Sequence, residues 1–219
     1  MWGRVDKASD GQNCRRVAAP GLLLLALALA VAPSVARAAS FTAAGVTFSD
    51  ELGGLVLESV SGHGSMDDPF VVVERLTDPN GGTLEFRVDP AMGNRIGSIH
   101  SIGFALVKIV ENATSLPWDS FEVELQSTLG VPSTYADGLS FGQGSTAGRP
   151  FSGTGFKHAT VTDEPYDRVD FDGGRIPLHG ETTLRFVITE SLPLEVAYLL
   201  QRPMKPVAAL RQRSATRNG

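Results

Sequence analysis

The chain has 219 residues, of which 42% are hydrophobic and 20% are charged, and its formal net charge is −5. This composition excludes a disordered chain and a protein with many membrane spans. The 24 glycines and 13 prolines follow no Gly-X-Y period, which excludes collagen, and they separate apolar runs as in an all-β protein.

The N-terminal segment has the three parts of a secretory signal peptide. A basic region precedes the apolar run 22–31, and Ala36-Arg37-Ala38 supplies a small-x-small cleavage pattern. The apolar run is shorter than the ~20 residues of a spanning helix. An uncleaved membrane anchor and a twin-arginine signal at Arg15-Arg16 are the alternatives.

These features predict three regions in the chain. They are a signal peptide at 1–38, a single domain at 39–202 and a disordered basic tail at 203–219. No later segment is apolar enough to span a membrane once the signal is removed. We therefore expect a secreted protein, in the periplasm or in the medium.

Cleavage would make the protein strongly acidic. It removes five basic and two acidic residues, which leaves 14 basic and 22 acidic ones. Five of the basic residues lie in the last 18 positions, so the body at 39–201 has a net charge of −13. Such a body repels phosphate backbones, which argues against nucleic acid as a partner. The only cysteine, Cys14, lies in the targeting segment, so the mature domain should have no disulfide, catalytic thiolate or cysteine metal site.

Apolar runs and alternating segments predict about eight strands in the body. Three runs are apolar on both faces and indicate inner strands, at 55–60, 70–73 and 104–110. The remaining strand candidates either alternate apolar and polar residues or are short. They lie at 84–89, 121–126, 139–141, 184–189 and 195–200. Phe121, Val123 and Leu125 should face the core, with Glu122 and Glu124 on the solvent face.

Turn residues separate these segments and favour an antiparallel β-sandwich, with a β-barrel as the alternative. The turn at 78–82 should join 70–76 and 83–88 as a hairpin. The segment 130–155 is the longest weakly structured stretch, which is typical of a functional or mobile loop. The common catalytic and nucleotide-binding motifs are absent, and the four histidines are far apart in the sequence.

Carboxylates are dense near residue 170. Asp163, Glu164, Asp167, Asp170 and Asp172 lie within ten residues, before the Gly173-Gly174 turn. Calcium prefers such oxygen ligands, so Asp163, Asp167, Asp170 and Asp172 are candidates for a calcium site of low affinity, the one cofactor that the sequence suggests. The alternative is an acidic, solvated edge strand.

Three aromatic residues are candidates for stacking on sugar rings: Trp118, Tyr135 and Tyr166. Trp118 follows Pro117 at the head of a strand, where an anchor at the edge of the core is an equal interpretation. Glu122 and Glu124 have the residue types of a glycosidase pair, but their alternation with apolar residues favours the outer face of a strand.

Two stretches, 45–73 and 117–141, resemble a group of uncharacterised secreted proteins of proteobacteria. The later segments Asp163-Glu164-Pro165-Tyr166-Asp167 and Phe171-Asp172-Gly173-Gly174 fit the same group. The resemblance covers most of the mature chain. It implies an exported bacterial β-sandwich and transfers no activity, because the group has none established.

The sequence therefore favours an exported, non-enzymatic β-sandwich with a structural, adhesive or interaction role, with a surface glycan or a protein as its partner. A carbohydrate- or calcium-binding module is the first alternative. A hydrolase whose site is scattered along the chain is the second.

Overall fold

The computed structural model describes residue 2 and residues 38–142, 149, 151–192 and 195–204. The signal peptide expected at 1–38 lies outside this part of the chain except for Trp2 and Ala38, and the expected tail lies outside it from residue 205 onward. Pro203 and Met204, which the sequence assigned to the tail, belong to the last strand. No helix among the described residues is long and apolar enough to cross a membrane.

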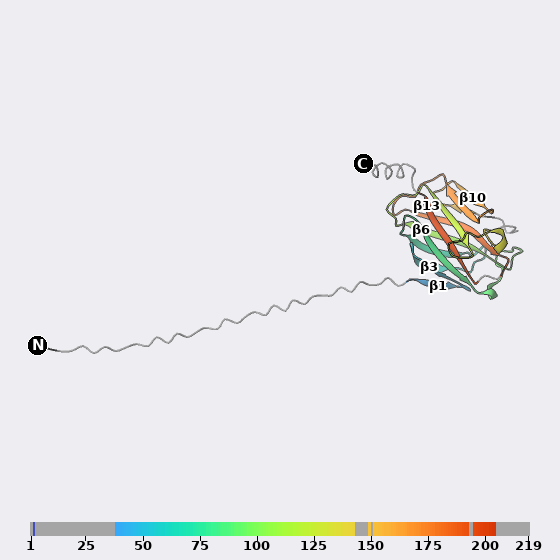
Figure 1. Ribbon diagram of the computed structural model, residues 1–219, viewed down its shortest axis with the longest axis horizontal. Helices are drawn as coiled ribbons and strands as arrows, with labels where there is room; N and C mark the ends of the chain where they lie inside the picture. Colours follow the sequence, from blue (N-terminus) through green and yellow to red (C-terminus); the bar gives the residue numbers. More distant parts are fainter. Residues whose placement is uncertain (1, 3–37, 143–148, 150, 193–194, 205–219) are drawn as a thin grey trace. The chain divides into compact units, whose positions relative to one another are not determined.

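The strands form two sheets that pack face to face as a β-sandwich (Figure 1). The seven-stranded sheet has the order β1 (Ser40–Ala43), β2 (Val46–Ser49), β5 (Gly82–Val88), β13 (Val196–Met204), β7 (Ser120–Gln126), β11 (Arg168–Asp172) and β10 (His158–Thr162). The six-stranded sheet has the order β3 (Leu55–Ser61), β4 (Phe70–Leu76), β6 (Ile102–Asn112), β12 (Glu181–Glu190) and β8 (Leu139–Ser140), and β9 (Ser152–Gly153) also pairs with β12. The expectation of an antiparallel sandwich is thus confirmed, and the two sheets do not close into a barrel.

Nearly all neighbouring strands of the described sheets are antiparallel, and β4 and β6 are parallel. The connection between β4 and β6 passes through β5 in the other sheet and through the short 3-10 helix η1 (Pro90–Met92). A second 3-10 helix, η2 (Tyr135–Asp137), precedes β8. These connections leave several loops at the ends of the six-stranded sheet.

Apolar side chains from both sheets fill the space between them. Phe121, Val123 and Leu125 of β7 are at most 1% exposed and face this core, as their alternation predicted. Four phenylalanines join the layers. Between the sheets, Phe48 packs against Phe70 and Phe86 against Phe104, with ring centroids 5.7 and 5.9 Å apart. Within each sheet, Phe48 packs against Phe86 at 6.4 Å and Phe70 against Phe104 at 5.7 Å. Such edge-to-face and tilted contacts stabilise aromatic pairs beyond their buried area.

The expected hairpin of β4 and β5 is wrong, because the two strands belong to different sheets. The backbone N–H groups of Thr77 and Asp78 both donate to the carbonyl of Gly54, and this contact directs the chain across the edge of the sandwich instead of back along β4. The run at 55–60 is also not an inner strand, since β3 lies at the edge of its sheet and Val56 is 42% exposed.

The solvent face expected for β7 is covered. Glu122 and Glu124 do lie on the outer face, but each is only 5% exposed. Arg202 of the neighbouring strand β13 lies over them, and its guanidinium donates to Glu122 and to Glu124 at 2.6 Å each. Gln126 donates to Glu124 at 2.8 Å. These carboxylates therefore hold β7 to β13 and are not ordinary surface groups.

Glu124→Ala should lower the free energy of unfolding by about 1–3 kcal/mol, because it removes the acceptor of the buried NH2 group of Gln126 and a hydrogen bond to the charged Arg202. Thr160→Ala, on an exposed position of the edge strand β10, should change it by less than about 0.5 kcal/mol. Urea unfolding of both variants and the parent would measure this. Equal, small effects would show that the Arg202 contacts do not stabilise the domain.

Candidate functional site

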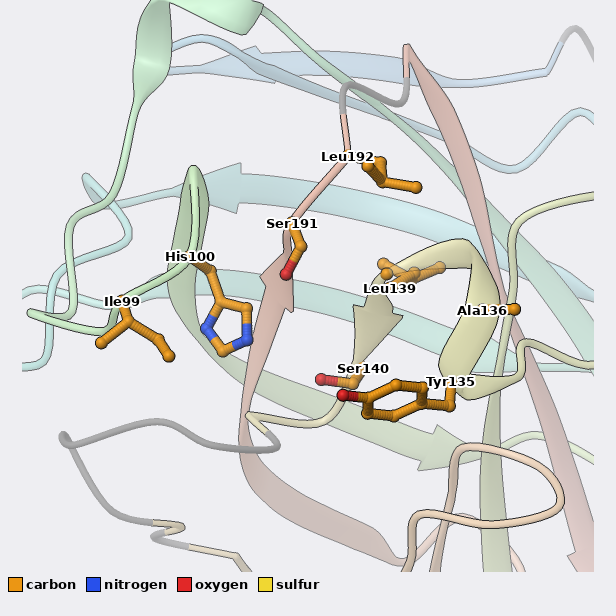
Figure 2. Close-up of a pocket in the computed structure, with 9 residues that line it drawn as sticks. Ile99, His100, Tyr135, Ala136, Leu139, Ser140, Ser191 and Leu192 are labelled. Atoms are coloured by element: carbon orange, nitrogen blue, oxygen red, sulfur yellow. The ribbon is translucent and has the colours of Figure 1, made fainter.

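A cavity of about 550 Å³ lies at one end of the six-stranded sheet (Figure 2). Three segments that are far apart in the sequence form its walls. They are the loop before β6 with Ile99 and His100, the segment of η2 and β8 at 135–140, and the residues Ser191 and Leu192 after β12. The strand ends bring these segments together, so the cavity depends on the sandwich beneath it.

Asp137 fixes the wall made by η2 and β8. Its carboxylate accepts hydrogen bonds from the hydroxyls of Ser127 and Ser133 at 2.7 and 2.8 Å. It also accepts from the backbone N–H of Leu139 at 3.1 Å. A buried or half-buried carboxylate with several donors holds a turn in one conformation. The hydrogen bonds of Asp137 therefore hold the wall that carries Tyr135 against the ends of the neighbouring segments.

Gly138 brings the third segment close to this wall. Its φ of +77° is a left-handed conformation that favours glycine, and a Cβ here would lie 3.2 Å from the backbone nitrogen of Leu192. The carbonyl of Gly138 accepts a hydrogen bond from the N–H of Ser191 at 2.9 Å. Ser191 and Leu192 are thereby held at the rim of the cavity.

Asn94 orders the loop that carries His100. Its side-chain amide donates to the carbonyl of His100 at 2.9 Å, and its carbonyl oxygen accepts from the N–H groups of Ile96 and Ser98 at 3.1 and 3.2 Å. The imidazole Nδ1 of His100 lies 3.3 Å from the hydroxyl of Ser98. Partial burial lowers the pKa of His100, so the ring is neutral at neutral pH.

The cavity combines exposed apolar groups with hydrogen-bonding groups. Ile99, Tyr135 and Leu192 are 80%, 72% and 54% exposed, which is unusual for large apolar side chains gathered at one place. Figure 2 shows that the imidazole of His100 and the phenol of Tyr135 come from opposite walls, with the side chains of Ser140 and Ser191 between them. An amphipathic small molecule fits such a lining better than an ion does.

Among the cavity-lining residues, the structure shows no nucleophile joined to a base. The hydroxyl of Ser140 pairs with that of Thr189 at 2.9 Å, and the neighbour of the His100 Nδ1 is Ser98, not a carboxylate. The general pattern of nucleophile, base and orienting acid is therefore not assembled by these groups.

The structure does not bring the four candidate calcium ligands together. Asp163 forms a two-point ion pair with Arg149 at 3.0 and 2.7 Å, Asp170 pairs with Arg168 at 3.0 Å, and Asp172 pairs with His158 at 2.8 Å. Asp167 is fully buried. Within the described ranges, no three histidine or acidic side chains lie close enough to hold a metal ion.

Only one of the three candidate aromatic residues lies at the cavity. Tyr135 lines it. Trp118 is 1% exposed, donates from Nε1 to the hydroxyl of Thr114 at 3.1 Å and packs on Phe121, so it anchors the core. Tyr166 is 47% exposed in the turn between β10 and β11. Sequence patterns do not single out His100, Ser140 or Ser191, because each is a common residue type and no recognisable motif surrounds it.

Asp167 is a buried carboxyl group close to this region. Burial raises its pKa to about 7, and the negative charges of Asp163, Asp137 and Glu164 act in the same direction, while the backbone of Phe141 opposes them. The backbone of Asp167 donates to the carbonyl of Ser133 and accepts from the N–H of Leu125, at 3.1 and 3.0 Å. Asp167 thus connects β7 to the segment that leads into the cavity wall.

Comparison with known proteins finds no match for this chain among family models, curated proteins or solved structures.

Asp167→Asn should stabilise the protein in a pH-dependent way. Because the pKa of Asp167 is about 7 in the folded protein and 3.8 ordinarily, the unfolded chain gives up this proton first as the pH rises. The parent therefore loses stability between about pH 4 and pH 7, by at most about 1.4 kcal/mol per pH unit, and no more above that window.

Thermal melts of parent and variant from about pH 4 to pH 8 would measure the effect. The midpoint of the variant should rise relative to the parent across this window and then stay constant. A difference that is the same at every pH would mean that Asp167 stays ionised in the folded protein.

Proposed function

We propose that this protein is an exported, non-enzymatic binding module that holds a carbohydrate in the cavity between His100 and Tyr135. The observation that carries the proposal is the lining itself, in which the exposed ring of Tyr135 and the imidazole of His100 come from opposite walls and Ser140 and Ser191 add hydroxyl groups. A site at the strand ends of a sandwich can bind a ligand without a conformational change.

Both the apolar face of a sugar ring and its hydroxyl groups find complementary groups in this lining. The C–H face of a pyranose ring stacks on an aromatic side chain, and its hydroxyls both donate and accept hydrogen bonds. Tyr135 offers the exposed ring, and His100 and Ser191 offer groups that donate or accept. The acidic body disfavours nucleic acids and other polyanions as alternatives.

Export is supported by the sequence of the first 38 residues and by the resemblance to secreted proteobacterial proteins. An adhesive or interaction role outside the cytoplasm would place the cavity where surface glycans are present. Calcium is a less favoured ligand, because three of the four carboxylates proposed for it pair with Arg149, Arg168 and His158, and the fourth, Asp167, is buried.

A glycan array with the purified protein tests the binding proposal. Tyr135→Ala should weaken binding of the best glycan by about two- to tenfold, since an aromatic contact contributes about 0.5–1.5 kcal/mol. Tyr166→Ala removes an exposed tyrosine that does not line the cavity, and it should leave the affinity unchanged.

Three outcomes of the array would contradict the proposal. Absence of binding to any glycan would exclude a carbohydrate as the ligand. Equal losses of affinity in both variants would show that the binding site lies outside the cavity. Cleavage of a bound glycan would show that the protein is an enzyme. Running the array with calcium and with a chelator shows whether the metal takes part.

Export makes a separate prediction. The small residues at Ala36 and Ala38 should direct cleavage after Ala38 or Ala39, so the mature chain should begin at Ala39 or Ser40. N-terminal sequencing of the protein recovered from a bacterial periplasm or medium measures this. A recovered chain that still begins at Met1 would contradict it.

A further inference from the structure

An ion pair lies inside the sandwich, among the apolar side chains that join the two sheets. Nζ of Lys108 in β6 lies 2.8 Å from Oε1 of Glu74 in β4, and both side chains are 0% exposed. The two strands are parallel neighbours, with Lys108 beside Val72 and Glu74 beside Val110. The long lysine side chain therefore reaches diagonally along the inner face of the sheet.

The surroundings of this pair are apolar. Along β4, Glu74 lies on the same face as Val72 and Leu76. Along β6, Lys108 lies on the same face as Leu106 and Val110, and all four apolar residues belong to the hydrophobic core. In the described part of the protein, neither Nζ of Lys108 nor the carboxylate of Glu74 has a further hydrogen-bond partner. Two charges with no other partner carry a desolvation penalty of several kcal/mol per ion in such a place.

We propose that Lys108 and Glu74 condense to an isopeptide bond between Nζ of the lysine and Cδ of the glutamate. The site supplies the two reacting groups in contact and excludes bulk water. Holding an amine against a carboxyl group replaces a bimolecular reaction by an intramolecular one, which is a large kinetic advantage.

The step is balanced within the pair. Transfer of one proton from the ammonium to the carboxylate gives a neutral amine and a carboxylic acid. The lone pair of Nζ then attacks Cδ, and the hydroxyl of the acid leaves as water with one proton from Nζ. The product is an amide with one N–H and one C=O. No oxidant, reductant or further reactant takes part.

Burial favours each stage of this reaction. It lowers the pKa of Lys108, although the charge of Glu74 acts in the opposite direction, and a neutral amine is the nucleophilic form. The product carries no charge, so condensation removes the desolvation penalty of both ions. Release of the water from the core opposes the reverse reaction.

The bond would lock the parallel pair of strands. It closes a covalent loop from residue 74 to residue 108, which includes β5 of the other sheet. The chain has one cysteine and so cannot form an intramolecular disulfide. An isopeptide bond would restrict the unfolded chain in the same manner as a disulfide, with the added resistance of an amide to reducing agents.

The mass of the purified, denatured protein tests the proposal. N-terminal sequencing first shows at which residue the chain begins, so that the mass expected from the sequence is known. We expect a mass lower by one water than the mass of the sequence. Proteolysis and tandem mass spectrometry should recover a branched peptide that joins Lys108 to Glu74. Hydroxylamine should leave this mass unchanged, whereas it would add to a succinimide at Asp137-Gly138 or Asp172-Gly173 and open the ring.

The matched control is the double variant Glu74→Leu, Lys108→Met. It replaces both ions by apolar side chains of similar size, a change that commonly leaves a fold intact, and it should show the full mass of its sequence. A parent protein with its full mass overturns the proposal. So does a loss of water that maps elsewhere, or a loss of ammonia with a branch at Gln201, whose buried amide also has no hydrogen-bond partner in the described part of the chain.

Discussion

Four phenylalanine rings connect the two sheets of this protein, and the rest of the structure is arranged around them. Phe48 and Phe86 project from one sheet and Phe70 and Phe104 from the other, so that each ring touches two others of the set. The contacts fix the register in which the sheets face each other. In a chain with no disulfide, this apolar layer is the main source of stability.

The packed layer also determines where function can reside. Side chains between the sheets are committed to the core, and much of the outer face of β7 is covered by Arg202. Residues at the strand ends are not needed to fill the core or to cover the outer face of β7, so they are available for binding. The loop that carries His100 and the segment that carries Tyr135 both extend from strands anchored in the core, and this anchoring positions two walls of the cavity.

Alternation of apolar and polar residues was enough to predict the sandwich and the inward face of β7. It did not identify the strands β1, β2, β9 and β10, which are short and contain few consecutive apolar residues. The residues of the turn between β4 and β5 fit a hairpin, which the structure does not form. Whether a tight turn returns to the same sheet depends on a distant contact, here the carbonyl of Gly54.

The candidate site was harder to predict, for a related reason. Glu122 and Glu124 are buried by Arg202, which is about 80 residues away in the chain. The carboxylates near residue 170 form one cluster in the sequence, yet three of them have a separate hydrogen-bond partner in the fold: Asp163, Asp170 and Asp172. Tyr135 was found by residue type alone. The other walls of the cavity come from segments that meet only in the folded chain.

Backbone amide hydrogen exchange tests the central claim that the sandwich presents a ligand site at its strand ends. The protein is compared with and without the oligosaccharide that binds best on a glycan array. Ligand should slow exchange in 98–101, 134–140 and 191–192 and leave the slow exchange of β6 and β12 unchanged. Slower exchange confined to other loops, or a change spread through the core strands, would contradict the account.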